Sequence, residues 1–223
     1  MKVKFLKSEK TALNILTFWF EPETKLRYIA GQYIELYLPH ENADDRGQKR
    51  WFTLSSAPSD ELLSISTKIT PERSSFKNTL TSLQSGDLVE MSQPMGDFIL
   101  PKDKNIPLVF IAGGIGTTPF RSIIADLKNN NEKRNISLIY SARSQQEIAF
   151  SDTFDYLEEK FYEFTDTILS AEQIINLTGD LGSSYFYISG PEPVVEQLQK
   201  ALLQNNIPKN HIYTDFFPGY KEI

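Results

Sequence analysis

The clearest chemical feature of the sequence is a glycine-rich turn in FIAGGIGTTPFRSII, residues 110–124. An apolar run ends there in glycines, and two threonines and a proline precede a segment with helical spacing. Glycine lets the backbone approach a ligand closely, and the free N–H groups at the start of a helix favour a phosphate. Threonine caps a helix well, and proline suits its first position. The residues that this pattern predicts at a phosphate are Gly114, Gly116, Thr117 and Thr118.

The dinucleotide-binding fingerprint G-x-G-x-x-G lacks its third glycine here, because Pro119 stands in that place. A tight strand-to-helix turn without a ligand is therefore the alternative. The next apolar run ends in YSARS, residues 140–144. An acidic residue near such a place binds the ribose of NAD, whereas a basic residue can meet the 2′-phosphate of NADP. Ser141 and Arg143 thus favour NADP, unless Arg143 is an ordinary solvated or ion-paired side chain.

A second group of chemically capable residues lies in QKRWFTLSSAP, residues 48–58. Strand alternation places Arg50 and Phe52 on one side and Trp51 and Thr53 on the other. An arginine can clamp a pyrophosphate, an aromatic side chain can stack on a planar ring, and a hydroxyl can bond a ring nitrogen. An amphipathic barrel strand without a ligand explains the same residues, so both interpretations stay open.

The first half of the chain must position the residues of the QKRWFTLSSAP segment. Its short alternating segments are rich in β-branched and aromatic residues and predict an antiparallel barrel or sandwich. These segments span residues 13–21, 33–39, 50–56, 62–69 and 87–93, with one helix predicted over Ser75–Leu83.

From Ile106 onward, continuous apolar segments alternate with helical ones, which predicts a parallel sheet covered on both faces. The expected strands are 106–114, 136–142, 164–170, 184–190 and 212–217. The expected helices are 118–130, about 152–161, 171–177 and 193–204. We therefore predict two domains, residues 1–102 and residues 103–223.

Composition narrows the function classes. The 223 residues include no cysteine, which excludes disulfides, thiolate zinc sites, cysteine nucleophiles and cysteine-ligated iron–sulfur clusters. With only His40 and His211 as histidines, we expect no metal site. The net charge of −6, all of it after residue 104, disfavours nucleic acid as a partner. No apolar run has the length of a signal peptide or a membrane span, so we expect a soluble cytoplasmic protein.

Taken together, the motifs resemble those of the ferredoxin–NADP reductase-like flavoenzymes, in the same order and over essentially the whole chain. They are RWFT at 50–53, GDFILP at 96–101, GGIGTTP at 113–119, YSARS at 140–144 and SGPEP at 189–193. The resemblance implies an antiparallel β-barrel that binds FAD, followed by a Rossmann-like α/β domain that binds NADP or NAD.

The resemblance also implies roles for residues of the first domain. Arg50 would meet the flavin pyrophosphate, Phe52 would lie against the isoalloxazine, and Thr53 would bond near flavin N5. The further flavin contacts expected on this basis are Trp51, Ile65, Thr67, Lys68, Ser74 and Ser75.

In the second domain, the resemblance implies that the glycine turn holds the nucleotide pyrophosphate and that Ser141 and Arg143 face the adenosine ribose. The family's Cys-Gly-Pro motif near the nicotinamide reads Ser189-Gly190-Pro191 here, so a serine replaces the cysteine. Many members end in an aromatic residue that covers the flavin, a role that Phe217 or Tyr220 would fill.

The implied activity is hydride transfer from NAD(P)H to flavin N5, with Thr53 and Ser189 as the catalytic residues. Electrons would then pass to a separate acceptor, such as a ferredoxin-like protein, free flavin, a ferric chelate or a quinone. One alternative is a regulatory or electron-docking subunit that binds flavin or nucleotide without turnover. Another is an NAD(P) dehydrogenase with a β-rich substrate domain and no flavin.

Overall fold

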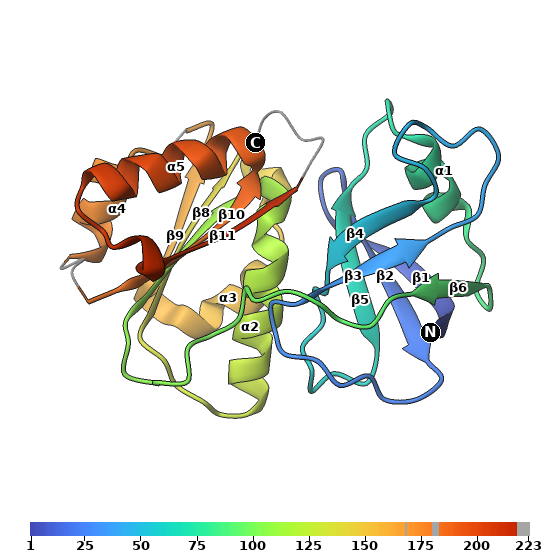
Figure 1. Ribbon diagram of the computed structural model, residues 1–223, viewed down its shortest axis with the longest axis horizontal. Coiled ribbons are helices and arrows are strands. Elements are labelled where there is room, and N and C mark those ends of the chain that lie inside the picture. Colours follow the sequence, from blue (N-terminus) through green and yellow to red (C-terminus); the bar gives the residue numbers. More distant parts are fainter. Residues whose placement is uncertain (168, 180–182, 218–223) are drawn as a thin grey trace.

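The computed structural model describes residues 1–167, 169–179 and 183–217, in which two sheets are joined by residues 92–107 (Figure 1). The first sheet is antiparallel, in the order β4-β3-β6-β1-β2-β5. A bridge between Leu54 and Ile65 brings its two edge strands together, so the sheet curls into a barrel. Its elements are β1 (Lys2–Ala12), β2 (Ile15–Pro22), β3 (Tyr33–Tyr37), β4 (Lys49–Thr53), β5 (Leu63–Lys68), α1 (Ser75–Ser82) and β6 (Leu88–Met91).

Strand β1 is an addition to the elements expected from the sequence. Only Val3 and Phe5 of this strand reach the barrel core, and residues 7–10 are exposed. The apolar alternation therefore stops after two positions, although the strand continues by pairing with β2 over its whole length.

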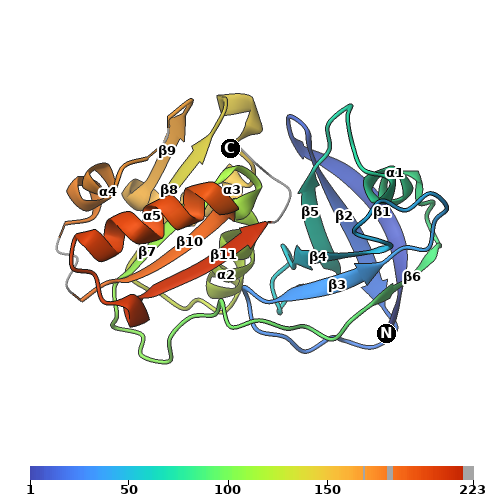
Figure 2. The same ribbon diagram turned by 45° about the horizontal axis from the view of Figure 1, so that its top comes forward.

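The second sheet is parallel, in the order β11-β10-β7-β8-β9. Its strands are β7 (Leu108–Gly113), β8 (Ile136–Ala142), β9 (Phe161–Thr165), β10 (Tyr185–Pro191) and β11 (Ile212–Phe217). Helices α2 (Thr118–Asn129) and α3 (Ser151–Phe154) pack on one face, and α4 (Ala171–Thr178) and α5 (Glu192–Gln204) pack on the other. Figure 2 shows α5 lying along the sheet and β11 directed toward the barrel. The predicted fold class is confirmed.

The region after residue 150 corrects two expectations. The helix expected over 152–161 is only α3 followed by 3₁₀ turns over Asp155–Lys160, because Glu158 has φ +55° and interrupts the helical path. The strand expected over 164–170 is β9, which begins at Phe161, since Phe161 pairs with Leu138 of β8.

Helix α2 lies between the parallel sheet and the barrel (Figure 1) and connects them. The Ser122 hydroxyl donates a 2.6 Å hydrogen bond to the carbonyl of Ser56, and Arg121 donates to the carbonyl of Ser55 at 2.6 Å. The connecting segment also contributes, because Phe98 packs against Phe120 and Tyr187 with ring centroids 5.7 and 5.1 Å apart. The proposed domain boundary after residue 102 falls within this segment.

None of the helices in the described ranges is long and apolar enough to cross a bilayer.

Candidate active site between the two domains

The strand order of the parallel sheet places a crevice beside the glycine turn. The chain runs from β7 outward to β8 on one side, and later to β10 on the other. In open α/β sheets, ligands bind beyond the carboxyl ends of the strands at such a switch point. Gly114–Thr117 follow β7 as a 3₁₀ turn, and Ser189–Pro191 end the adjacent β10.

Two glycines of this turn are required by the backbone itself. Gly114 has φ +52°, a left-handed conformation that favours glycine. A Cβ on Gly116 would lie 2.2 Å from the carbonyl oxygen of Ser189. The turn therefore packs directly on the end of β10, and this contact explains Gly116 without any ligand.

The ends of β4 and β11 bring the two domains into contact at the mouth of this crevice. The Thr53 hydroxyl donates a 3.3 Å hydrogen bond to Oδ2 of Asp215. Both residues are shielded from solvent to a large extent, and Thr53 is only 4% exposed. Asp215 pairs in register with Ser189 of β10, so the three side chains come from adjoining positions.

Burial raises the pKa of Asp215 from 3.8 to about 6, and the Thr53 and Ser189 hydroxyls oppose that rise. Within the described part of the chain, the buried Ser189 Oγ has no hydrogen-bond partner of regular geometry. The same is true of the buried Thr117 Oγ1 on the glycine turn. Buried hydroxyls in this condition are uncommon and fit a crevice that a polar ligand completes.

In the barrel domain, a cationic group lies beside a helix start. Arg50 lies over the Phe76 ring of α1, 5.0 Å from its centroid, and its Nη2 donates to Asp44 at 2.5 Å. The backbone N–H of Asp44 in turn donates to Ser75 Oγ at 3.3 Å. The Asp44 carboxylate is thus held by Arg50, while the backbone N–H of Asp44 is bonded to the first residue of α1. This arrangement fits a flavin pyrophosphate, since anions bind at such helix starts and pair with arginine.

The other predicted barrel residues differ in their exposure. Trp51 is 62% exposed, whereas Phe52 is buried against Phe76 with centroids 6.0 Å apart. Ile65 and Thr67 are buried, and Ile65 belongs to the barrel core.

Two more predicted barrel residues make defined polar contacts. Ser74 caps α1 by accepting the N–H of Lys77. Lys68 forms a 2.9 Å ion pair with Glu147, which links the barrel to the segment after β8.

The predicted nucleotide residues lie along the carboxyl edge of the parallel sheet. Thr118 donates to the carbonyl of Ile115, and Ser141 donates to that of Thr167 at 2.6 Å. Arg143 is exposed, and Gly190 and Pro191 are buried.

The expected aromatic cover of the flavin falls at the end of the described chain. Phe217 is the last residue of β11, where its backbone pairs with Pro191. The Phe217 side chain and Tyr220 lie outside the described residues.

Sequence reasoning missed three acidic residues of this region: Asp215, Asp44 and Glu147. Asp215 lies 162 residues from Thr53 and Glu147 lies 79 residues from Lys68, whereas Asp44 lies 6 residues before Arg50. The only local signal was Asp215 itself, a charge within the apolar run IYTDFF.

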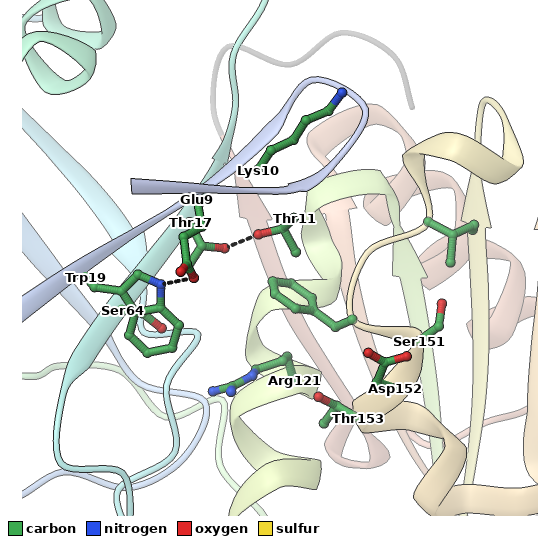
Figure 3. Close-up of a pocket in the computed structure, with 12 residues that line it drawn as sticks. Glu9, Lys10, Thr11, Thr17, Trp19, Ser64, Arg121, Ser151, Asp152 and Thr153 are labelled. Carbon is green, nitrogen blue, oxygen red and sulfur yellow. Dashed lines mark hydrogen bonds between the residues drawn. The ribbon is translucent and has the colours of Figure 1, made fainter. Parts of the chain in front are cut away.

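A separate cavity of about 420 Å³ lies between the β1–β2 hairpin and residues 148–153 (Figure 3). It has none of the predicted site residues in its wall. On its barrel side, Thr11 and Thr17 share a 2.5 Å hydrogen bond, and Trp19 donates to Glu9. Among the described residues, no group of histidine, aspartate or glutamate side chains could hold a metal ion.

Comparisons with known proteins agree with this geometry. The FAD/NAD-binding domain of a nitric oxide dioxygenase from Vibrio cholerae superposes with a TM-score of 0.80 at 24% identity, covering 97% of this chain and 98% of that one. Ferredoxin–NADP⁺ reductase from Plasmodium falciparum gives a TM-score of 0.77 at 18% identity, covering 97% and 95%.

Residues 110–173 match the family model of the oxidoreductase NAD-binding domain. Over 226 residues the chain is 26% identical to flavohemoprotein A of Dictyostelium discoideum, covering 92% of this chain and 57% of that protein. The chain is thus similar to the ferredoxin–NADP reductase-like flavin oxidoreductases. In fold, the barrel and the parallel-sheet domain together match the FAD/NAD-binding domain of the nitric oxide dioxygenase. The chain spans less than two thirds of the length of the flavohemoproteins that it matches.

Proposed function

We propose that this protein takes hydride from NAD(P)H onto FAD and passes the electrons to an acceptor outside its two domains. The observation that carries the proposal is the contact between Thr53 and Asp215, 3.3 Å apart across the domain boundary. This contact joins the end of β4, which carries the RWFT motif, to β11 at the edge of the parallel sheet. The buried hydroxyl of Ser189 lies at the adjoining position.

On the barrel side, Arg50 and the start of α1 would hold the flavin pyrophosphate, and the capture of the Asp44 carboxylate by Arg50 supports this role. Thr53 would orient the ring through its hydroxyl. Phe52 is packed against Phe76, so its position is fixed before a ligand arrives. FAD supplies a hydride acceptor that can release electrons singly or in pairs.

On the nucleotide side, the turn at Gly114–Thr117 would receive the pyrophosphate, and Ser189 would border the nicotinamide. Asp215 would contact the bound rings either directly or through the Thr53 hydroxyl. Its carboxyl would change charge near pH 6. The protein's contribution is thus orientation of two planar rings in a site largely closed to water.

The direct test is spectroscopic. Purified protein reconstituted with FAD should show flavin absorbance, and NADPH or NADH should bleach it under anaerobic conditions. Protein that takes up no FAD would overturn the proposal. Flavin binding without reduction by either nucleotide, or without turnover with ferricyanide, would instead support a binding subunit.

The preference for NADPH is tested separately at Arg143. An arginine bonded to the 2′-phosphate contributes about 1.5–3 kcal/mol, so Arg143→Ala should lower kcat/KM for NADPH about tenfold to 100-fold. The value for NADH should change little. Equal losses with both nucleotides would show that Arg143 does not read the 2′-phosphate.

A further inference from the structure

The loop between β3 and β4, residues 40–48, folds back onto the proposed pyrophosphate site. Nη1 of Arg50 donates to the carbonyls of Arg46, Gly47 and Lys49 at 3.0, 2.9 and 2.7 Å. Nη2 of Arg50 donates to Asp44 at 2.5 Å. The Arg50 side chain is therefore engaged by its own loop, and it is only 13% exposed.

The Asp44 carboxylate receives the kinds of donor that a phosphate would receive. Besides the Arg50 guanidinium, the backbone N–H of Arg46 donates to Oδ1 at 3.0 Å, and the Arg46 side chain donates to Oδ2 at 3.3 Å. Burial alone would raise the pKa of Asp44, but the hydrogen bonds from Arg50 and Arg46 hold that pKa below its ordinary value. The carboxyl is thus an anion at neutral pH.

The loop is also tied to α1. The Asp44 N–H donates to Ser75 Oγ, and Nε2 of His40 lies 3.1 Å from the same hydroxyl oxygen. Nδ1 of His40 lies 2.8 Å from the carbonyl oxygen of Leu38, so Nδ1 donates a hydrogen bond to that oxygen. Arg50 and Ser75, two predicted flavin contacts, are therefore both bound by this one loop.

At its end the loop is also held by Gln48, which accepts from the Tyr37 hydroxyl and donates to the carbonyl of His40. Most of residues 41–46 are exposed, and the contacts just described are polar. Gly47 has φ +70° with no atom within 4 Å of where a Cβ would be, so the backbone has room to turn there. Polar contacts at the surface are individually weak and exchange readily with other anions.

We propose that the Asp44 carboxylate competes with the flavin pyrophosphate for Arg50. FAD binding then requires Asp44 to leave Arg50. The affinity for FAD is therefore lower than it would be if Asp44 did not occupy Arg50. The inference rests on the proposed function, because it assumes that Arg50 binds the flavin pyrophosphate.

The test measures FAD binding by flavin fluorescence in wild type, Asp44→Asn and a charge-matched control, Asp45→Asn. Asp45 is exposed and next to Asp44, so both variants remove one negative charge from the same loop. We expect Asp44→Asn to lower the Kd for FAD about tenfold and Asp45→Asn to leave it nearly unchanged. In an Arg50→Ala background, Asp44→Asn should give no gain.

A second readout uses inorganic pyrophosphate to compete with FAD. In Asp44→Asn, pyrophosphate should displace FAD at a concentration closer to the Kd of pyrophosphate itself. Circular dichroism checks that each variant is folded. An unchanged or higher Kd for FAD in Asp44→Asn would overturn the inference alone, because Asp44 would then orient Arg50 rather than compete for it. Absence of FAD binding in wild type and all variants would overturn the proposed function as well.

Discussion

The hydroxyl of Thr53 at the end of β4 donates a 3.3 Å hydrogen bond to the carboxyl group of Asp215 on β11. The two residues belong to different domains, so the contact exists only when the barrel and the parallel sheet are docked. Helix α2 fixes that docking through Arg121 and Ser122, which bond to the backbone just after β4. The proposed reaction site is therefore positioned by the domain interface and not by either domain alone.

Thr53→Val removes the hydroxyl while keeping the shape of the side chain. A hydrogen bond to a charged group contributes about 1.5–3 kcal/mol, so flavin reduction by NAD(P)H should slow about tenfold to 100-fold. Stopped-flow absorbance measures this rate, and Thr53→Ser should restore it. A Thr53→Val enzyme that is reduced at the wild-type rate would remove Thr53 from the site.

Asp215→Asn should change how stability depends on pH. The folded protein holds a proton on Asp215 up to about pH 6, whereas the unfolded chain loses it near 3.8. This carboxyl therefore contributes stability at low pH and loses that contribution as the pH rises to about 6. The shift corresponds to at most about 3 kcal/mol.

Because asparagine carries no charge, Asp215→Asn should be about 1–3 kcal/mol more stable than wild type at pH 8, and this difference should be smaller at pH 4.5. Denaturant unfolding at both pH values measures the difference. A stability difference that is the same at pH 4.5 and pH 8 would show that Asp215 does not titrate in this range.

The sequence predicted those parts of the fold that have a regular apolar period. Strands β8 and β11 were predicted at the correct residues, since both are mainly apolar segments of seven and six residues. β1 was missed because its second half is polar and is held by backbone pairing with β2. The helix expected after residue 152 was too long because a single residue, Glu158, leaves the helical conformation.

The candidate site was predictable where motifs are local and unpredictable where contacts are long-range. The RWFT strand and the glycine turn each occupy consecutive residues, so both were visible in the sequence. The roles of Glu147 and Asp215 depend on contacts between chain segments that are distant in sequence, and that of Asp44 depends on how the loop before β4 folds back onto Arg50. A charge count on the sequence cannot distinguish these three carboxylates from exposed ones.

The ion pair between Lys68 and Glu147 should contribute to stability as an interdomain contact. Their side chains are only 16% and 11% exposed, and the charged atoms are 2.9 Å apart. A double-mutant cycle with Lys68→Met and Glu147→Gln should give a coupling energy of about 1–3 kcal/mol, measured by urea unfolding.

The matched control for this cycle is Lys104→Met, which breaks an ion pair with Glu132 whose lysine side chain is 61% exposed. That change should cost less than about 1 kcal/mol. A Lys68–Glu147 coupling no larger than the cost of Lys104→Met would place the domain contact elsewhere, with α2 as the remaining connection.

Gly116→Ala tests whether the glycine turn is required by packing. The new Cβ would lie 2.2 Å from the Ser189 carbonyl oxygen and 2.6 Å from the Gly190 Cα, and backbone atoms cannot move aside as a flexible side chain could. We expect a loss of more than about 3 kcal/mol in unfolding free energy.

Gly86→Ala is the control, because its φ of +101° strains an alanine but nothing lies within 4 Å of the new Cβ. It should cost about 1–2 kcal/mol. A Gly116→Ala protein as stable as Gly86→Ala, but with weaker NAD(P)H binding, would show that Gly116 serves the nucleotide and not the contact between β10 and the turn.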